Sequence, residues 1–205
     1  MGIYKDYILP WVIDWTLNTP ELRRLRRRIA QGLEGTVLEI GFGSGLNLPH
    51  LPGAVRRFCA VDPATFGRRL AARRIRACPV PVEFIGLDGA EIPLATGSVD
   101  VVLTTWTLCS VADLPGTLGE IRRVLKPGGR FHFLEHGLSP DAKVARWQHR
   151  LNPIEKVTGG GCQLILPIGE LVRASGFSMA SLENFYVTGP RFLTYMYQGV
   201  AVPPA

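Results

Sequence analysis

The stretch that decides the fold covers residues 36–45 and reads Thr36-Val37-Leu38-Glu39-Ile40-Gly41-Phe42-Gly43-Ser44-Gly45. Its first half is a short apolar run, which predicts a buried strand. Its second half carries a glycine at every second position. Glycine lets a chain turn sharply and lets the backbone approach a bound nucleoside closely. The stretch therefore predicts a strand followed by a nucleoside-binding loop.

This loop differs from two other glycine-rich loops. The dinucleotide-binding pattern G-x-G-x-x-G fits Gly41 and Gly43, but its third glycine position holds Leu46. Gly45 stands where that pattern asks for no glycine. A P-loop is excluded because no Gly-Lys-Ser/Thr follows. The loop alone leaves more than one nucleoside cofactor open.

Two acidic residues follow later predicted strands. Asp62 ends a strand over residues 58–61, about 20 residues beyond the loop, where a carboxylate can accept the ribose hydroxyls of a nucleoside. Asp88 follows a third strand over 80–85 and is placed to accept from an adenine amine. The plain alternatives are a strand-end turn at Asp62 and a solvated loop at Asp88.

Strands and helices alternate after residue 35, which predicts a parallel sheet covered on both faces. Lys126-Pro127-Gly128-Gly129 reads as a tight turn, and residues 177–187 and 192–200 read as a terminal hairpin that makes the sheet mixed. The other predicted strands cover 99–104 and 130–134, and the predicted helices cover 64–77, 114–125, 140–151 and 168–175.

The composition suits one globular unit with a basic surface. The chain has 205 residues, 46% of them hydrophobic, and a formal net charge of +6. Its arginines cluster at Arg23–Arg28 and Arg68–Arg76, which favours solvated helix faces. The four cysteines show no C-x-x-C spacing, so neither a zinc site nor a redox motif is indicated, and no metal is predicted. Reduced thiols in a cytoplasmic compartment are expected.

Taken together, these motifs resemble the class I S-adenosylmethionine-dependent methyltransferases. The resemblance rests on Glu39-x-Gly41-x-Gly43-x-Gly45, then Asp62, Asp88 and Leu125–Gly129, in that order. It implies an α/β, Rossmann-like fold with a seven-stranded mixed sheet, helices on both faces and a C-terminal antiparallel hairpin. It also implies that S-adenosyl-L-methionine is the cofactor and that the following residues bind it: Glu39, Ile40, Gly41, Gly43, Gly45, Asn47, Asp62, Pro63, Asp88, Gly89 and Thr105.

A second likeness covers nearly the whole chain. Tyr7–Pro10, Gly45–Pro49, Glu135–Gly137, Gly160–Leu164 and Gly189–Ala201 resemble bacterial relatives of the methyltransferase-like thiol methyltransferases and of phospholipid N-methyltransferase-like proteins. Those relatives tend to carry His where this chain has Gln163, which is a departure from the pattern. The likeness implies direct in-line methyl transfer to a small apolar acceptor, either a thiol or a lipid-like amine.

The acceptor side is expected in loops beyond the carboxyl ends of the strands. His136 titrates near neutrality and is the leading candidate for a base, with Glu135 beside it. The expected substrate-binding residues are Tyr4, Tyr7, Trp106, Cys109 and Cys162. Structural histidine and buried cysteine are the plain alternatives. His132–His136 matches a zinc-protease pattern, but that pattern needs a helix and these residues read as a strand.

The chain divides into an N-terminal segment, residues 1–34, and a methyltransferase domain, residues 35–205. Residues 4–15 carry an aromatic stripe, kinked near Pro10, and Thr19-Pro20-Glu21 begins a second helix. Three interpretations of the stripe stay open: a lid with Tyr4 and Tyr7 facing the cofactor, a peripheral membrane contact, or a dimer contact. No secretion signal is evident in residues 1–17.

Two alternative functions remain at this point. The basic charge favours a nucleic-acid methyltransferase, but the Asn/Asp-Pro-Pro-aromatic motif of many base methylases is absent after the fourth strand. The second alternative is a module that binds the cofactor without turnover, because a fold does not fix a function. We expect a small-molecule acceptor, no nucleic acid, and a monomer or homodimer.

Overall fold

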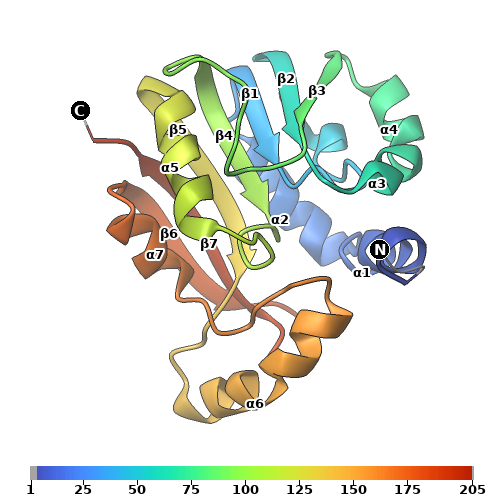
Figure 1. The fold of residues 1–205 in the computed structure, drawn as a ribbon, viewed down its shortest axis with the longest axis vertical. Helices are drawn as coiled ribbons and strands as arrows, with labels where there is room; N and C mark the ends of the chain where they lie inside the picture. The colour runs from blue at the N-terminus through green and yellow to red at the C-terminus, as the bar shows by residue number, and fades with distance from the viewer. Residues whose placement is uncertain (1–3, 205) are drawn as a thin grey trace.

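The computed structural model describes residues 4–204, and its seven strands form one mixed sheet in the order β3-β2-β1-β4-β5-β7-β6 (Figure 1). The first five strands pair in parallel, whereas β7 runs antiparallel to both β5 and β6. The predicted mixed sheet with a terminal hairpin is confirmed. The strands are β1 (Gly35–Ile40), β2 (Val55–Val61), β3 (Val82–Gly86), β4 (Val99–Thr105), β5 (Leu125–His136), β6 (Ser178–Tyr186) and β7 (Tyr195–Val202).

Helices cover both faces of the sheet. Neighbouring residues of β1 point to opposite faces, so that Leu38 packs in the cluster with α5 and α7 while Val37 packs in the cluster with α2. Both side chains are fully buried. The helices are α1 (Leu9–Thr16), α2 (Pro20–Ala30), α3 (Thr65–Leu70), α4 (Ala72–Ala77), α5 (Leu114–Val124), α6 (Ala142–Thr158) and α7 (Ile168–Ala174).

The carboxyl ends of the central strands face α1 and α6 (Figure 1). A short π-helix, Tyr4–Ile8, leads into α1, and Pro10 lies in the first turn of that helix rather than at a kink within it. The start of α2 agrees with the sequence prediction, because the Thr19 hydroxyl accepts a hydrogen bond from the backbone N–H of Leu22. Within residues 4–204, no helix is long and apolar enough to cross a membrane.

The start of β5 differs from the sequence prediction. Strand β5 begins at Leu125 opposite Val99, and the pairing resumes at Arg130 opposite Val101. Lys126–Gly129 is therefore a bulge within a strand rather than a turn before one. Its backbone turns outward at Gly128, where φ is +78°.

The helical regions also differ in detail. The single helix predicted over 64–77 is two short helices that meet at the fully buried Ala71. Helix α6 begins after Asp141, whose side chain caps it, and continues through Pro153 to Thr158. The predicted end near residue 151 was wrong, because proline is tolerated here inside the helix.

Packing of the hairpin on the sheet gives a test of the fold. A Cβ on Gly199 of β7 would collide with the ring of Phe133 on β5. We expect Gly199→Ala to lower the free energy of unfolding by about 1–3 kcal/mol, because extra atoms in a filled core force neighbours to move. The loss should be smaller in a Phe133→Leu background, where the side chain can give way. Urea unfolding of the four chains measures this, and equal losses in both backgrounds would contradict the packing.

Candidate functional site

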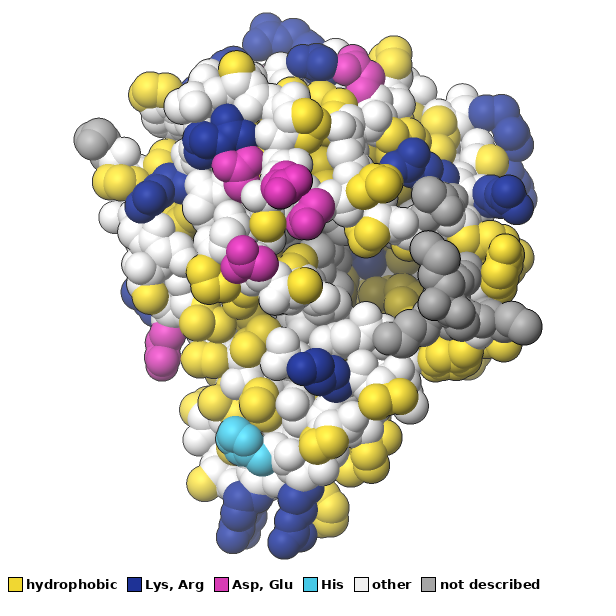
Figure 2. Space-filling model, in the orientation of Figure 1, with side chains coloured by type: hydrophobic (Ala, Val, Ile, Leu, Met, Phe, Trp, Pro, Cys, Tyr) yellow, Lys and Arg dark blue, Asp and Glu magenta, His cyan; other side chains and the backbone are white. Residues whose placement is uncertain are grey.

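A cleft of about 690 Å³ opens at the carboxyl ends of β1, β2 and β4. Figure 2 shows a hollow on this face of the molecule. The volume lies within the usual range for a small-molecule site, roughly 300–1,000 Å³. Gly45 does not line the cleft, since a Cβ there would meet Phe42, Leu48 and Ala71 behind the loop. The other predicted cofactor residues all line it: Glu39, Ile40, Gly41, Gly43, Asn47, Asp62, Pro63, Asp88, Gly89 and Thr105.

The glycine loop presents bare backbone to the cleft. Gly41 and Gly43 have φ values of +79° and +54°, which L side chains rarely adopt. A Cβ on Gly41 would collide with Thr107, whereas a Cβ on Gly43 would meet nothing within 4 Å. Gly41 is therefore needed for packing, and Gly43 leaves the space that a ligand would occupy.

Asp62 ties this loop to the end of β2. Its carboxylate accepts hydrogen bonds from the backbone N–H groups of Gly43 and Ala64, each at 2.6 Å. Burial raises the pKa of Asp62, although the two N–H groups and Arg68 act against that shift. An ionised carboxylate has about four acceptor positions, so about two remain for ribose hydroxyls. Asp88 is exposed at the cleft edge, and its Oδ1 accepts from the N–H of Ala90 at 2.9 Å.

A buried polar network forms the floor of the cleft. Arg26 donates hydrogen bonds to Asn47 Oδ1 at 2.9 Å and to Thr105 Oγ1 at 2.8 Å. Asn47 in turn donates to Glu39 Oε1. Burial raises the pKa of Glu39 to about 8, against the effects of Asn47 and Arg26, and burial lowers the pKa of Arg26 to about 10. Among the described residues, Glu39 Oε2 has no hydrogen-bond partner.

Arg26 is a cleft residue that the sequence interpretation missed. It was assigned to a solvated basic face, but only 3% of its surface is exposed, so that assignment was wrong for this residue. Its position could have been found from the helical period. Arg26 lies four residues after Leu22 and three before Ile29, and both of these are buried on the same face of α2.

Helix α1 forms an aliphatic wall of the cleft. Tyr4 and Tyr7 do not line it, contrary to the prediction. The Tyr4 hydroxyl donates to the carbonyl of Thr158 at 2.7 Å, and the Tyr7 ring packs edge-on against Phe66. The residues that do line the cleft from this side are Leu9, Pro10, Ile13 and Leu17. The outer face of α1 leaves aromatic side chains exposed, and its interpretation as a membrane or dimer contact stays a prediction.

Trp106 lines the cleft, as predicted, in an unusual backbone conformation. Its φ is +51°, the only positive value among the non-glycine residues that the structure describes. The guanidinium of Arg26 lies 4.7 Å from the centre of the Trp106 ring. The backbone N–H of Trp106 donates to the carbonyl of Leu134. Such strained residues cluster at ligand sites, because the surrounding contacts must hold them in place.

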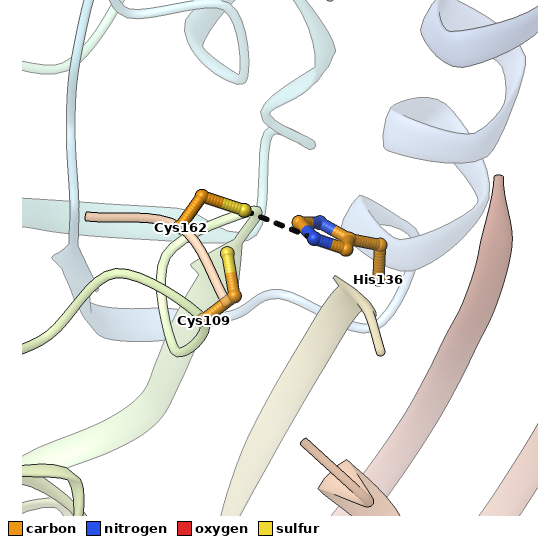
Figure 3. A group of neighbouring side chains, drawn as sticks. All are labelled: Cys109, His136 and Cys162. Atoms are coloured by element: carbon orange, nitrogen blue, oxygen red, sulfur yellow. Dashed lines mark hydrogen bonds between the residues drawn. The ribbon is translucent and has the colours of Figure 1, made fainter. Parts of the chain in front are cut away.

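The remaining acceptor-side candidates gather behind the cleft wall (Figure 3). Cys109 follows β4, His136 ends β5, and Cys162 follows α6. The sulfur atoms of the two cysteines and a ring nitrogen of His136 lie within 4.8 Å of one another. Cys162 Sγ is 3.0 Å from His136 Nε2. Glu135 accepts hydrogen bonds from the N–H groups of Thr107 and Leu108. Glu135 thus positions the loop that carries Cys109.

The electrostatics of this buried group are coupled. Interaction with Cys162, and the charge of His136, hold the pKa of Cys109 well below its ordinary value. Contact with Cys109, together with burial, raises the pKa of Cys162. Burial is the largest single effect and would lower the pKa of His136, but the charge and hydrogen bond of Cys109 and the charges of Glu135 and Glu155 together outweigh it, and the net shift is upward. Burial raises the pKa of Glu135 to about 8. Catalytic roles for His136 and Glu135 stay predictions, because neither lines the cleft.

The zinc-protease pattern at residues 132–136 does not form its site. These residues lie on β5, where His132 Nδ1 pairs with the carbonyl of Ile29 at 2.9 Å. His132 and His136 lie four residue steps apart along the strand, about 13 Å, which is too far to share one ion.

Comparison with known proteins finds similar methyltransferases. A family model described as a methyltransferase domain matches residues 38–133. The thiol S-methyltransferase TMT1B of Rattus norvegicus is 35% identical over 153 residues, which are 73% of this chain and 63% of that protein. The chain carries a methyltransferase domain and is similar to the class I methyltransferases. It spans less than two thirds of the length of this relative.

Solved structures share the fold. The [4+2]-cyclase SpnF superimposes with a TM-score of 0.71 at 19% identity, over 90% of this chain and 82% of that one. The trans-methyltransferase CalH, in complex with SAH, gives a TM-score of 0.63 at 25% identity, over 97% of this chain and 60% of that one. S-adenosylmethionine is the cofactor of this methyltransferase family.

The residues of the cleft fit this cofactor. Glu39 Oε2 is a buried acceptor without a partner, which suits the ammonium group of the methionine part. Asp62 has acceptor positions left for the ribose. The space beside Gly43 admits the nucleoside against the backbone.

Asp62 gives a direct test of the cofactor site. An Asp62→Asn side chain keeps the shape but has a single acceptor oxygen and no charge, so it cannot hold both N–H groups and the ribose. Hydrogen bonds to charged groups contribute about 1.5–3 kcal/mol, so we expect the affinity for S-adenosylhomocysteine to fall about 10- to 100-fold. Isothermal titration calorimetry measures this. Asp141→Asn, at a helix cap outside the cleft, is the matched control and should bind normally.

The raised pKa of Glu39 predicts a pH dependence of stability. The unfolded carboxyl titrates near its ordinary value of 4.5, whereas the folded one titrates near 8. The protonated form therefore stabilises the fold at low pH, and this contribution is lost as pH rises towards 8. Between pH 4.5 and about 8, the free energy of unfolding of the cofactor-free protein should fall by about 1.4 kcal/mol per pH unit relative to that of the Glu39→Gln variant. Urea unfolding at several pH values checks this, and a pH-independent difference between the two chains would refute it.

Proposed function

We propose that this chain transfers the methyl group of S-adenosylmethionine to a small apolar acceptor with one nucleophilic heteroatom. A thiol is the leading acceptor class, and a lipid-like amine is the second. One observation carries the proposal: a single cleft joins the polar floor around Glu39 and Asp62 to the aliphatic wall of α1. The polar part suits the cofactor and the apolar part suits an apolar acceptor.

The chemistry asks little of the protein. When bound, the cofactor supplies a methyl group already activated on a sulfonium. Glu39 and Asp62 would orient the methionine and ribose ends, and Leu9 and Ile13 would exclude water from the acceptor. A base is needed only if the acceptor arrives protonated and holds its proton tightly. Direct transfer without a base agrees with the apolar side chains that line the acceptor side of the cleft.

A thiol is favoured for two reasons. The rat relative is named a thiol S-methyltransferase, and the aligned part includes 73% of this chain. A thiol has an ordinary pKa of about 8.5, so a useful fraction is ionised near neutral pH without a base at the reacting atom. An alcohol would need such a base, and His136 and Glu135 lie behind the cleft wall.

The two alternative functions receive less support. A nucleic-acid substrate would meet the aliphatic residues of α1 rather than a basic groove at the cleft. The fold does not by itself fix methyl transfer, since SpnF shares the fold and is named a cyclase, so a module without turnover stays an alternative. Turnover must therefore be measured.

Product formation with matched acceptors tests the proposal. We expect S-adenosylhomocysteine to form with alkyl thiols, with KM falling as the chain lengthens, and not with the matched alcohols. Mass spectrometry of the reaction follows both products. If S-adenosylhomocysteine formed only with amines, a lipid-like amine would be the acceptor class. If the protein bound the cofactor but formed no product with thiols, amines or quinols, the non-catalytic module would be favoured.

Two neighbouring residues of α1 supply a matched pair of variants. Ile13 lines the cleft, whereas Val12 does not and is similarly exposed. Ile13→Ser should raise KM for a long-chain thiol several-fold with little change in kcat, because apolar contact to the acceptor is lost. Val12→Ser should leave both constants unchanged. Equal effects of the two variants would show that α1 does not contact the acceptor.

A further inference from the structure

We propose that Cys109, His136 and Cys162 form a binding site for one soft divalent metal ion of the zinc type. The three side chains come from separate parts of the chain and turn toward a common point, as Figure 3 shows. All three are buried. This proposal is independent of the identity of the methyl acceptor.

The geometry is close to that of a known coordination class. The three potential ligand atoms lie within 4.8 Å of one another, and Cys162 Sγ lies 3.0 Å from His136 Nε2. In a tetrahedral zinc site, with Zn–S near 2.3 Å and Zn–N near 2.0–2.1 Å, ligand atoms lie roughly 3.5–3.8 Å apart. Small side-chain rotations would bring the cluster to these separations. Two sulfurs and one imidazole form a ligand set that selects zinc-like ions over magnesium or calcium.

Charge balance also favours an ion at this point. Two thiolates and a neutral imidazole would cancel the charge of a divalent ion, so the complex would be neutral inside the protein.

The loops that carry the two cysteines are already tied together. The backbone N–H of Gln163 donates to the carbonyl of Cys109 at 2.9 Å. Glu135 holds the N–H groups of Thr107 and Leu108, just before Cys109. Gly160 and Gly161 turn the other loop with φ values of +70° and +110°. The sulfurs are therefore placed by backbone contacts rather than by flexible chain ends.

The site would lie directly behind the cleft. Ser110, next to Cys109, and Gly160, two residues before Cys162, both line the cleft. An ion would lock the loop after β4 to the loop after α6 and so fix this wall. Three protein ligands would leave a fourth position to water or another exogenous ligand.

Metal binding to the whole chain tests the proposal without any variant. The protein is purified under reducing conditions, stripped with a chelator and titrated with Co²⁺ and with Zn²⁺. We expect about one ion per chain, with intense thiolate-to-cobalt charge-transfer absorption and the visible bands of a tetrahedral site. Absence of stoichiometric binding in folded, reduced protein would overturn the proposal.

Variants then assign the ligands. Cys109→Ser and Cys162→Ser should each weaken Zn²⁺ binding at least tenfold, whereas Cys162→His keeps a ligand and should retain most of it. Cys78→Ser is the matched control, because Cys78 is a free cysteine outside the cluster. Circular dichroism confirms that each variant is folded. Unchanged binding in both serine variants, or a Cys109–Cys162 disulfide with no metal binding after reduction, would also overturn the proposal.

Discussion

The buried guanidinium of Arg26 is the constraint on which the cleft depends. It lies on α2, and its hydrogen bonds reach Asn47 after the glycine loop and Thr105 at the end of β4. A buried charge is costly unless hydrogen bonds compensate it, and Asn47 and Thr105 accept those bonds from Arg26. The N-terminal helices, the loop and the central strands are held in one arrangement, because moving any of them would leave a buried charge without its partners.

The same network prepares the cleft for a cationic group. Arg26 turns toward Asn47 and Thr105, so Glu39 keeps one oxygen without a partner among the described residues. A carboxylate left in this state is costly, which is why burial raises its pKa to about 8. An ammonium group of a ligand would restore its charge and complete the network.

The sequence predicted the features that are local along the chain. The glycine loop, Asp62 and Asp88 each follow a strand directly, and parallel strands bring their carboxyl ends to one edge, so the cofactor half could be derived. The terminal hairpin followed from Gly189-Pro190 between two apolar runs. The burial of Arg26 was not predicted, because four other arginines surround it in sequence. Its spacing from Leu22 and Ile29 nevertheless places it on the buried face of α2. The extent of β5 escaped because a bulge and a turn have the same residue signals.

The convergence of Cys109, His136 and Cys162 has no local signal at all. The spacing rules for metal sites count residues between neighbouring ligands, whereas these three come from separate loops brought together by the sheet. The same distinction separates the two halves of the cleft. The cofactor half is formed by loops that directly follow neighbouring parallel strands, and the fold around it persists in a cyclase at 19% identity. The acceptor half is assembled from α1 and from loops after β4 and α6, so its chemistry can change while the fold is kept. The methyltransferase domain therefore indicates the cofactor, and the acceptor has to be inferred from the residues of that second half.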